Sequence, residues 1–93
     1  MFQKTDVTLW AGVNSAVSLQ GRRLRWYCAH DGAGNRWGRE FDLPRGMSAG
    51  DVGSICPSSH GLTVVAKDGA LHVYDAQRGD WTERGNALRD GGT

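Results

Sequence analysis

The sequence predicts an all-β chain built from two similar four-stranded units. Short runs of alternating apolar and polar residues recur along its 93 residues, and no segment keeps the apolar spacing of an amphipathic helix over three turns. Fourteen glycines against two prolines indicate many tight turns. The order of these features repeats with a period in the forties, which is typical of the blades of a β-propeller.

Four strands are expected in the first half, each bounded by turn residues. Gly12 and Asn14 lie between the first two strands, and the loop HDGAGN precedes the fourth. The expected strands span residues 6–10, 16–20, 24–29 and 36–43. A break between the halves follows, marked by Pro44, Gly46, Ser48 and Gly50.

The series restarts in the second half. The turns PSSHG and DG separate expected strands at residues 51–56, 62–67 and 70–76, and a short final strand begins near Trp81. Residues 82–90 are also the best helix candidate of the chain, although Gly85 interrupts them.

The two halves can be overlaid residue by residue. Leu24 matches Leu71 at a separation of 47 residues. Tyr27 matches Tyr74 at the same separation, and Trp37 matches Trp81 at 44. We therefore expect one domain, residues 1–93, that consists of two repeats at about 4–46 and 50–90.

Two blades cannot close a ring, and each blade has two faces to bury. The sequence therefore predicts a homo-oligomer in which several copies complete the ring, three copies if the ring has six blades. The alternative is a small β-sandwich or barrel that is complete within one chain.

Composition argues against two classes of partner. A net charge of +1 is too small for binding driven by phosphate neutralisation, so no nucleic acid is expected. No run of 18 apolar residues is present, so no membrane span is expected. The N-terminus lacks the layout of a signal peptide, which predicts a cytoplasmic protein or one exported by a route that needs no such peptide. Cys28 and Cys56 are then expected to be reduced thiols.

Two tryptophans and their turns form the candidate binding site. Trp37 and Trp81 each follow a polar turn, where an indole face could pack on the C–H face of a sugar ring. The alternative is that each indole packs between neighbouring blades. The other candidate ligand-binding residues come from the same two turns: His30, Asp31, Arg36 and Arg78.

Several segments are similar to those of a known family. VTLWAGVNSAVSL (7–19), YCAHDGAGNRWGREF (27–41) and VYDAQRGDWTERG (73–85) together resemble the small two-blade bacterial lectins. The resemblance implies a chain that trimerises into a six-bladed propeller and binds fucose-like sugars, with aromatic contacts at Trp37 and Trp81. The family's polar sugar-binding residues are not retained, since Val17 and Val64 stand at its arginine positions.

No enzymatic activity is expected. The sequence has no G-x-S-x-G, P-loop or H-E-x-x-H motif. Cys28, His30, Cys56 and His60 are the right types to bind zinc, but their spacing is irregular, so neither a metal nor another cofactor is expected. The predicted function is a non-catalytic binding module with a glycan ligand. The alternative is a small all-β protein-binding module, such as an inhibitor, an immunity protein or the cement of a virion or other assembly.

Overall fold

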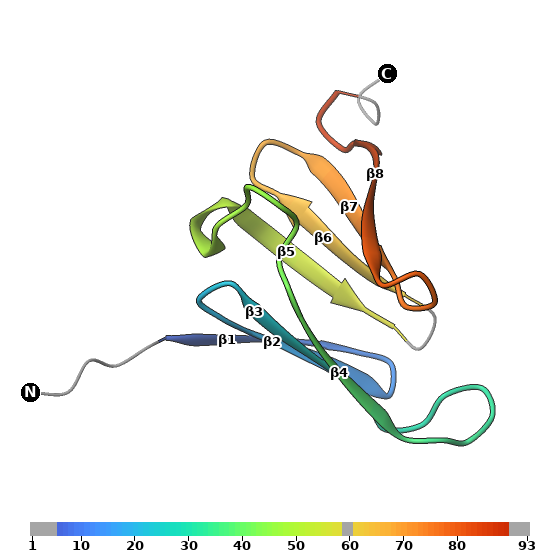
Figure 1. Cartoon of the computed structure of the whole chain (residues 1–93). Coiled ribbons are helices and arrows are strands. Elements are labelled where there is room, and N and C mark those ends of the chain that lie inside the picture. Colours follow the sequence, from blue (N-terminus) through green and yellow to red (C-terminus); the bar gives the residue numbers. More distant parts are fainter. Residues whose placement is uncertain (1–5, 59–60, 90–93) are drawn as a thin grey trace, which may run out of the picture.

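Eight strands form two antiparallel four-stranded sheets in the computed structural model, which describes residues 6–58 and 61–89 (Figure 1). Sheet 1 consists of β1 (Val7–Gly12), β2 (Ser15–Gln20), β3 (Arg23–Cys28) and β4 (Trp37–Asp42). Sheet 2 consists of β5 (Val52–Pro57), β6 (Leu62–Ala66), β7 (Ala70–Asp75) and β8 (Asp80–Asn86). A 3₁₀ turn, η1 (Ala49–Asp51), precedes β5. The predicted all-β class is confirmed.

The helix considered for the tail is wrong. Residues 80–86 form β8 instead, which pairs with β7 along the edge of sheet 2. Gly85 has a φ of 111°, a backbone conformation that an α-helix excludes. Asp90, the last residue of that expected helix, lies outside the described residues.

The core lies between the two sheets. Along β2 and β3 the side chains alternate between buried and more exposed, with Val17 and Trp26 almost fully buried, because successive residues of a strand point to opposite faces. Leu62 and Val64 of β6 are fully buried in the opposing face. One face of each sheet is thus buried against the other sheet.

Backbone hydrogen bonds identify which face of sheet 1 points inward. Ala29 N donates to Asn14 O at 2.7 Å. Asn14 and Ala29 are therefore a hydrogen-bonded cross-strand pair, here called a bonded rung of the β2–β3 ladder. Bonded and non-bonded rungs alternate in an antiparallel pair. The buried pair Val17–Trp26 lies three positions away and therefore stands on a non-bonded rung.

In sheet 2 the buried face is the opposite one: it carries the side chains of the bonded rungs. Ser58 N donates to Gly61 O at 2.9 Å, so Leu62, one position on, directs its backbone groups towards β7. Its rung with Tyr74 is therefore a bonded one, yet both side chains are buried. The two sheets have the same strand order, so β2–β3 of sheet 1 can be compared with β6–β7 of sheet 2. In both ladders the side chains of bonded rungs point to one face of the sheet, and the side chains of non-bonded rungs point to the other face. The front of one sheet thus packs on the back of the other, as in successive propeller blades and unlike a sandwich of two like faces.

The rungs confirm two residue matches between the halves, Leu24 with Leu71 and Tyr27 with Tyr74. Tyr27 pairs with Ala16 two positions from the Asn14 rung, so it stands on a bonded rung as Tyr74 does. The two tyrosines differ in burial, however. Tyr74 faces the core and is 9% exposed, whereas Tyr27 faces outward and is 48% exposed.

The match between the two tryptophans is wrong by one residue. Trp81 pairs with Tyr74, whereas the residue paired with Tyr27 is Gly38. Trp81 therefore corresponds to Gly38. Trp37 and Trp81 still both face the core. They do so because the two sheets bury opposite faces, so positions that differ by one residue both point inward.

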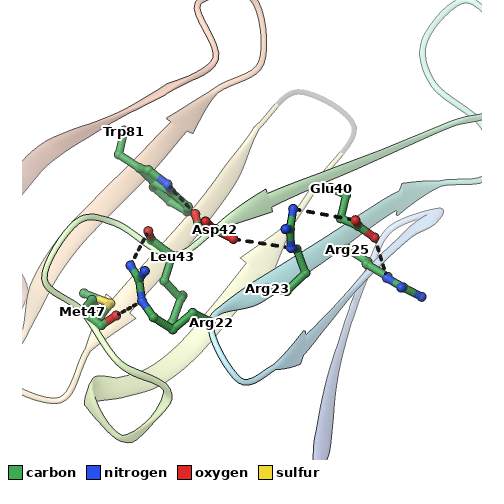
Figure 2. Close-up of polar contacts among 8 residues, drawn as sticks. All are labelled: Arg22, Arg23, Arg25, Glu40, Asp42, Leu43, Met47 and Trp81. Carbon is green, nitrogen blue, oxygen red and sulfur yellow. Dashed lines mark hydrogen bonds and ion pairs between the residues drawn. The ribbon is translucent and has the colours of Figure 1, made fainter.

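Arg22 fixes the connection between the sheets (Figure 2). Its Nε donates to Met47 O at 3.0 Å, and its second terminal nitrogen donates to Leu43 O and Pro44 O, each at 3.1 Å. Hydrogen bonds from a charged donor are stronger than neutral ones. The side chain thereby ties the β2–β3 turn to the chain segment that leads from β4 to β5.

The inner strands β1 and β5 lie close together at Gly12. A β-carbon at Gly12 would overlap the carbonyl oxygen of Pro57, so this approach needs a residue without a side chain. The outer edges are β4 and β8, and both carry charged side chains: Arg39, Glu40, Asp42, Asp80, Glu83 and Arg84. Neither cysteine forms a disulfide, and Cys28 is buried whereas Cys56 is exposed.

Candidate functional site

Trp37 packs against the core at the start of β4. Its ring meets that of Trp26 edge-on, with 4.7 Å between centroids and an interplanar angle of 88°. The Arg39 guanidinium lies 5.6 Å from the Trp37 ring centroid. Edge-on aromatic contacts and cation–π contacts each stabilise a packed ring. These contacts favour the packing interpretation of Trp37.

Trp81 is held in the same manner from sheet 2. Its Nε1 donates to Asp42 O at 3.0 Å, which joins β8 to the end of β4 (Figure 2). Its ring also meets Phe41 and Tyr74, with centroid distances of 5.8 Å and 5.2 Å. Phe41 and Tyr74 stack face to face at 3.8 Å. Trp81 therefore covers the interface between the two sheets on the side of their outer strands, β4 and β8.

The loop between β3 and β4 holds three of the predicted site residues. Asp31 Oδ1 accepts from Asn35 N at 2.9 Å and from Ala33 N at 2.8 Å, so the carboxylate organises its own loop. Hydrogen bonds from the Asn35 and Ala33 backbone and from the Trp37 side chain hold the pKa of Asp31 below its ordinary value of 3.8. His30 and Arg36 lie exposed in the same loop, and the structure gives them no hydrogen bond or ion pair within residues 6–58 and 61–89.

Arg78 lies in the separate β7–β8 turn. It forms an exposed ion pair with Asp80 at 3.4 Å, and Asp75 Oδ1 accepts from Gln77 N and Arg78 N within the same turn. Among the described residues, no hydrogen bond or ion pair joins this turn to the Asp31 loop. The six predicted site residues therefore lie in three separate places. His30, Asp31 and Arg36 lie in the β3–β4 loop, Arg78 lies in the β7–β8 turn, and Trp37 and Trp81 pack against the core.

A groove that the sequence analysis did not select lies on the outward face of sheet 1. It has a volume of about 410 Å³ and is lined by Arg25, Trp26, Tyr27, Gly38, Arg39 and Glu40. Tyr27 and Gly38 form one cross-strand pair, and Arg25 and Glu40 form the next pair on the same face. The absent side chain of Gly38 leaves the Tyr27 ring accessible from the β4 side.

Ion pairs fix the polar wall of this groove (Figure 2). Arg25 Nε lies 2.7 Å from Glu40 Oε2, and Arg23 bridges Glu40 and Asp42 at 3.7 Å and 3.4 Å. These pairs are solvent-exposed, so each contributes little to stability. They place a guanidinium and a carboxylate beside an exposed aromatic ring.

Tyr27 differs from the other aromatic side chains of the described residues. It is the one aromatic residue among them that is exposed, and no ring contact involves it. The alternation of RLRWYC predicts that Trp26 and Tyr27 face opposite ways, and the structure confirms it. The alternation could not show which of the two faces is buried.

Metal and membrane features are absent from the part of the chain that the structure describes. Within it, no group of three or more histidine, cysteine, aspartate or glutamate side chains is placed to hold a metal ion. Nor does any helix there have the length and apolar character needed to cross a bilayer. His60, one of the zinc ligand types considered above, lies outside the described residues.

The fold and the groove define a two-sheet, propeller-like chain with an aromatic and ion-paired surface site. No protein-family model, curated protein or solved structure matches the chain. The resemblance to two-blade lectins therefore stays a prediction.

Proposed function

We propose that the chain is a non-catalytic carbohydrate-binding module and that the sugar binds in the groove beside Tyr27. The observation that carries this proposal is the combination of a half-exposed phenol ring with the Arg25–Glu40 ion pair in one groove. A sugar has an apolar C–H face and a rim of hydroxyl groups. The ring offers a surface for the first, and the ion pair offers charged donors and acceptors for the second.

The groove replaces the tryptophans as the proposed sugar contact. Trp37 and Trp81 use their rings in contacts with Trp26, Phe41 and Tyr74. A sugar that stacked on either indole face would compete with those contacts. At Tyr27 it would compete only with water.

Two arginines provide a matched test. Arg25 and Arg78 each form one close exposed ion pair, and both side chains are 70% exposed, but only Arg25 lines the groove. We expect a glycan array to identify a ligand for the wild-type chain. Arg25→Met should weaken titrated binding of that ligand by about ten-fold or more, because it removes charged hydrogen bonds. Arg78→Met should leave binding unchanged.

Two results would refute the carbohydrate proposal. One is an array and a titration with simple sugars that both show no binding. The other is an equal loss of binding in the Arg25→Met and Arg78→Met chains.

A protein-binding module is the second candidate. It is favoured by Val7 and Leu9, which lie 51% and 71% exposed on the outward face of sheet 1. Contiguous exposed apolar residues often mark a surface that binds another protein. A stable hetero-complex purified from a native lysate, with no retention on sugar resins, would support this candidate.

A further inference from the structure

A second pocket lies at the end of sheet 2 where β5 begins and β6 ends (Figure 1). Its volume of about 440 Å³ is within the range of small-molecule sites. It shares no lining residue with the groove beside Tyr27. Its apolar part comes from Met47 and Ala66, which are 8% and 7% exposed. The pocket is therefore a site of its own, with a partly apolar wall.

Hydrogen bonds within the chain hold the walls of this pocket in place. The walls come from the linker between β4 and β5, from η1 and from the turn between β6 and β7. Arg22 donates to three carbonyl oxygens of the linker. Lys67 N donates to Asp51 O at 2.9 Å, which joins the β6–β7 turn to η1. A ligand would therefore not have to order these segments, and its binding would not carry that cost.

The two carboxylates of the pocket already accept hydrogen bonds from their own turns. Asp51 Oδ2 accepts from Ser48 N at 2.9 Å and from Ser48 Oγ at 3.1 Å. Asp68 Oδ1 accepts from Ala70 N at 3.0 Å. The Ser48 backbone and hydroxyl, and after them the charge of Lys67, hold the pKa of Asp51 below its ordinary value of 3.8. The charge of Lys67 thus reaches this side of the pocket, although the two side chains form no ion pair.

The three basic side chains of the pocket have no such partners. Within the described part of the chain, no hydrogen bond or ion pair involves the side chains of Arg45, Lys67 and His72. Arg45 belongs to the linker and Lys67 to the β6–β7 turn. His72 lies on β7, and its pairing with the fully buried Val64 places it on the inward face of sheet 2. Three unused cationic donors around a formed pocket indicate an anionic ligand.

We propose that this pocket binds the phosphate group of a small molecule. A phosphate monoester has a charge of about −1.5 to −2 at pH 7 and three acceptor oxygens. It therefore suits three donors from three segments better than a carboxylate, which has one charge and two oxygens. Met47 and Ala66 offer a surface to the apolar part of the same molecule. The chain thereby has two sites of different chemistry, a sugar groove on sheet 1 and a phosphate pocket on sheet 2.

Phenyl phosphate is the probe for this pocket, because it joins a phosphate to an apolar ring. We expect isothermal titration calorimetry at low ionic strength, where charges are least screened, to show that the wild-type chain binds it. Benzoate should bind about ten-fold more weakly, because it offers one charge and two oxygens. Inorganic phosphate should also bind more weakly, because it has no ring to pack on Met47 and Ala66.

Three methionine variants locate the site. Arg45→Met and Lys67→Met each remove one positive charge from the pocket and should weaken phenyl phosphate binding by about ten-fold or more. The effect should be large because Asp51 and Asp68 also line the pocket and repel an anion.

Arg36→Met is the matched control. Arg36 is also exposed and forms no hydrogen bond or ion pair among the described residues, but it lies in the β3–β4 loop. The variant changes the net charge equally and should leave phenyl phosphate binding unchanged. Circular dichroism should show that all three variants are folded, because no partner within the described residues loses a contact.

Four results would overturn the inference. Two concern the wild-type chain: no binding of phenyl phosphate, or binding of benzoate or inorganic phosphate that is equally tight. The third is unchanged phenyl phosphate binding in the Arg45→Met and Lys67→Met chains. The fourth is an Arg36→Met chain that loses as much affinity as they do. No sugar is present in these titrations, so their failure would not affect the carbohydrate proposal.

Discussion

Replacement of Gly12 by alanine probes a close approach between the two sheets. The new β-carbon would overlap Pro57 O and would lie 2.9 Å from Ser15 Oγ and 3.0 Å from Pro57 C. Two of these atoms belong to the backbone of β5, which cannot rotate away as a flexible side chain could. Insertion of a methyl group into a packed site costs about 1–3 kcal/mol, and we expect about 3 kcal/mol here because β5 itself must shift.

Thermal unfolding measures this cost. For a domain of this size each kcal/mol lowers Tm by about 4–8 °C, so Gly12→Ala should lower Tm by about 12–24 °C. Gly32→Ala is the control, because a β-carbon at Gly32 meets no atom within 4 Å and its φ is ordinary. Both variants should be compared at one protein concentration. If Gly12→Ala melts with the wild-type chain, the close approach of β1 to β5 is wrong.

Two further predictions concern the linker and the Asp31 loop. Arg22→Met keeps the aliphatic stem but removes three hydrogen bonds, and it should lower the free energy of unfolding in urea by about 2 kcal/mol. Arg45→Met, on the same linker, should change it by less than about 0.5 kcal/mol, and equal losses would contradict the role of Arg22. Folding lowers the pKa of Asp31, so its charged form stabilises the loop above pH 3.8 and this stability is lost as the pH falls through the folded value. The tryptophan fluorescence of the chain, to which the neighbouring Trp37 contributes, should therefore show an acid transition below about pH 4 that Asp31→Asn removes, and an unchanged transition would show that Asp31 does not cause it.

Most of the fold could be predicted from local signals. Alternation and turn residues located the first seven strands to within two residues at each end, and the start of β8 to within one residue. The end of β8 was not located. The overlay of the halves failed where turns differ in length. The β6–β7 turn contains Gly69 at a φ of 93° and is one residue longer than the β2–β3 turn, so Val17 corresponds to Thr63 and not to Val64. Such a one-residue slip transfers a side chain to the other face.

The candidate site was harder to predict for the same reason. Trp37 and Trp81 were selected as large aromatic residues beside polar turns, but both turns bring their indoles against the core. Tyr27 was not selected, because its exposure depends on which face of sheet 1 meets sheet 2. That choice depends on contacts between residues far apart in the chain, such as Phe41 on Tyr74, which no local pattern encodes.

The charged outer edges have a consequence for how copies of the chain can grow together. The unpaired N–H and C=O groups of β4 and β8 could accept another strand, and repeated addition of strands would lead to a cross-β fibril. Glu40 and Asp42 on β4, and Glu83 and Arg84 on β8, would bring charges together or strip them of water if two such edges met. Edge-to-edge addition is therefore disfavoured. The placement of charge on the outer strands thus protects the chain against unlimited addition of strands.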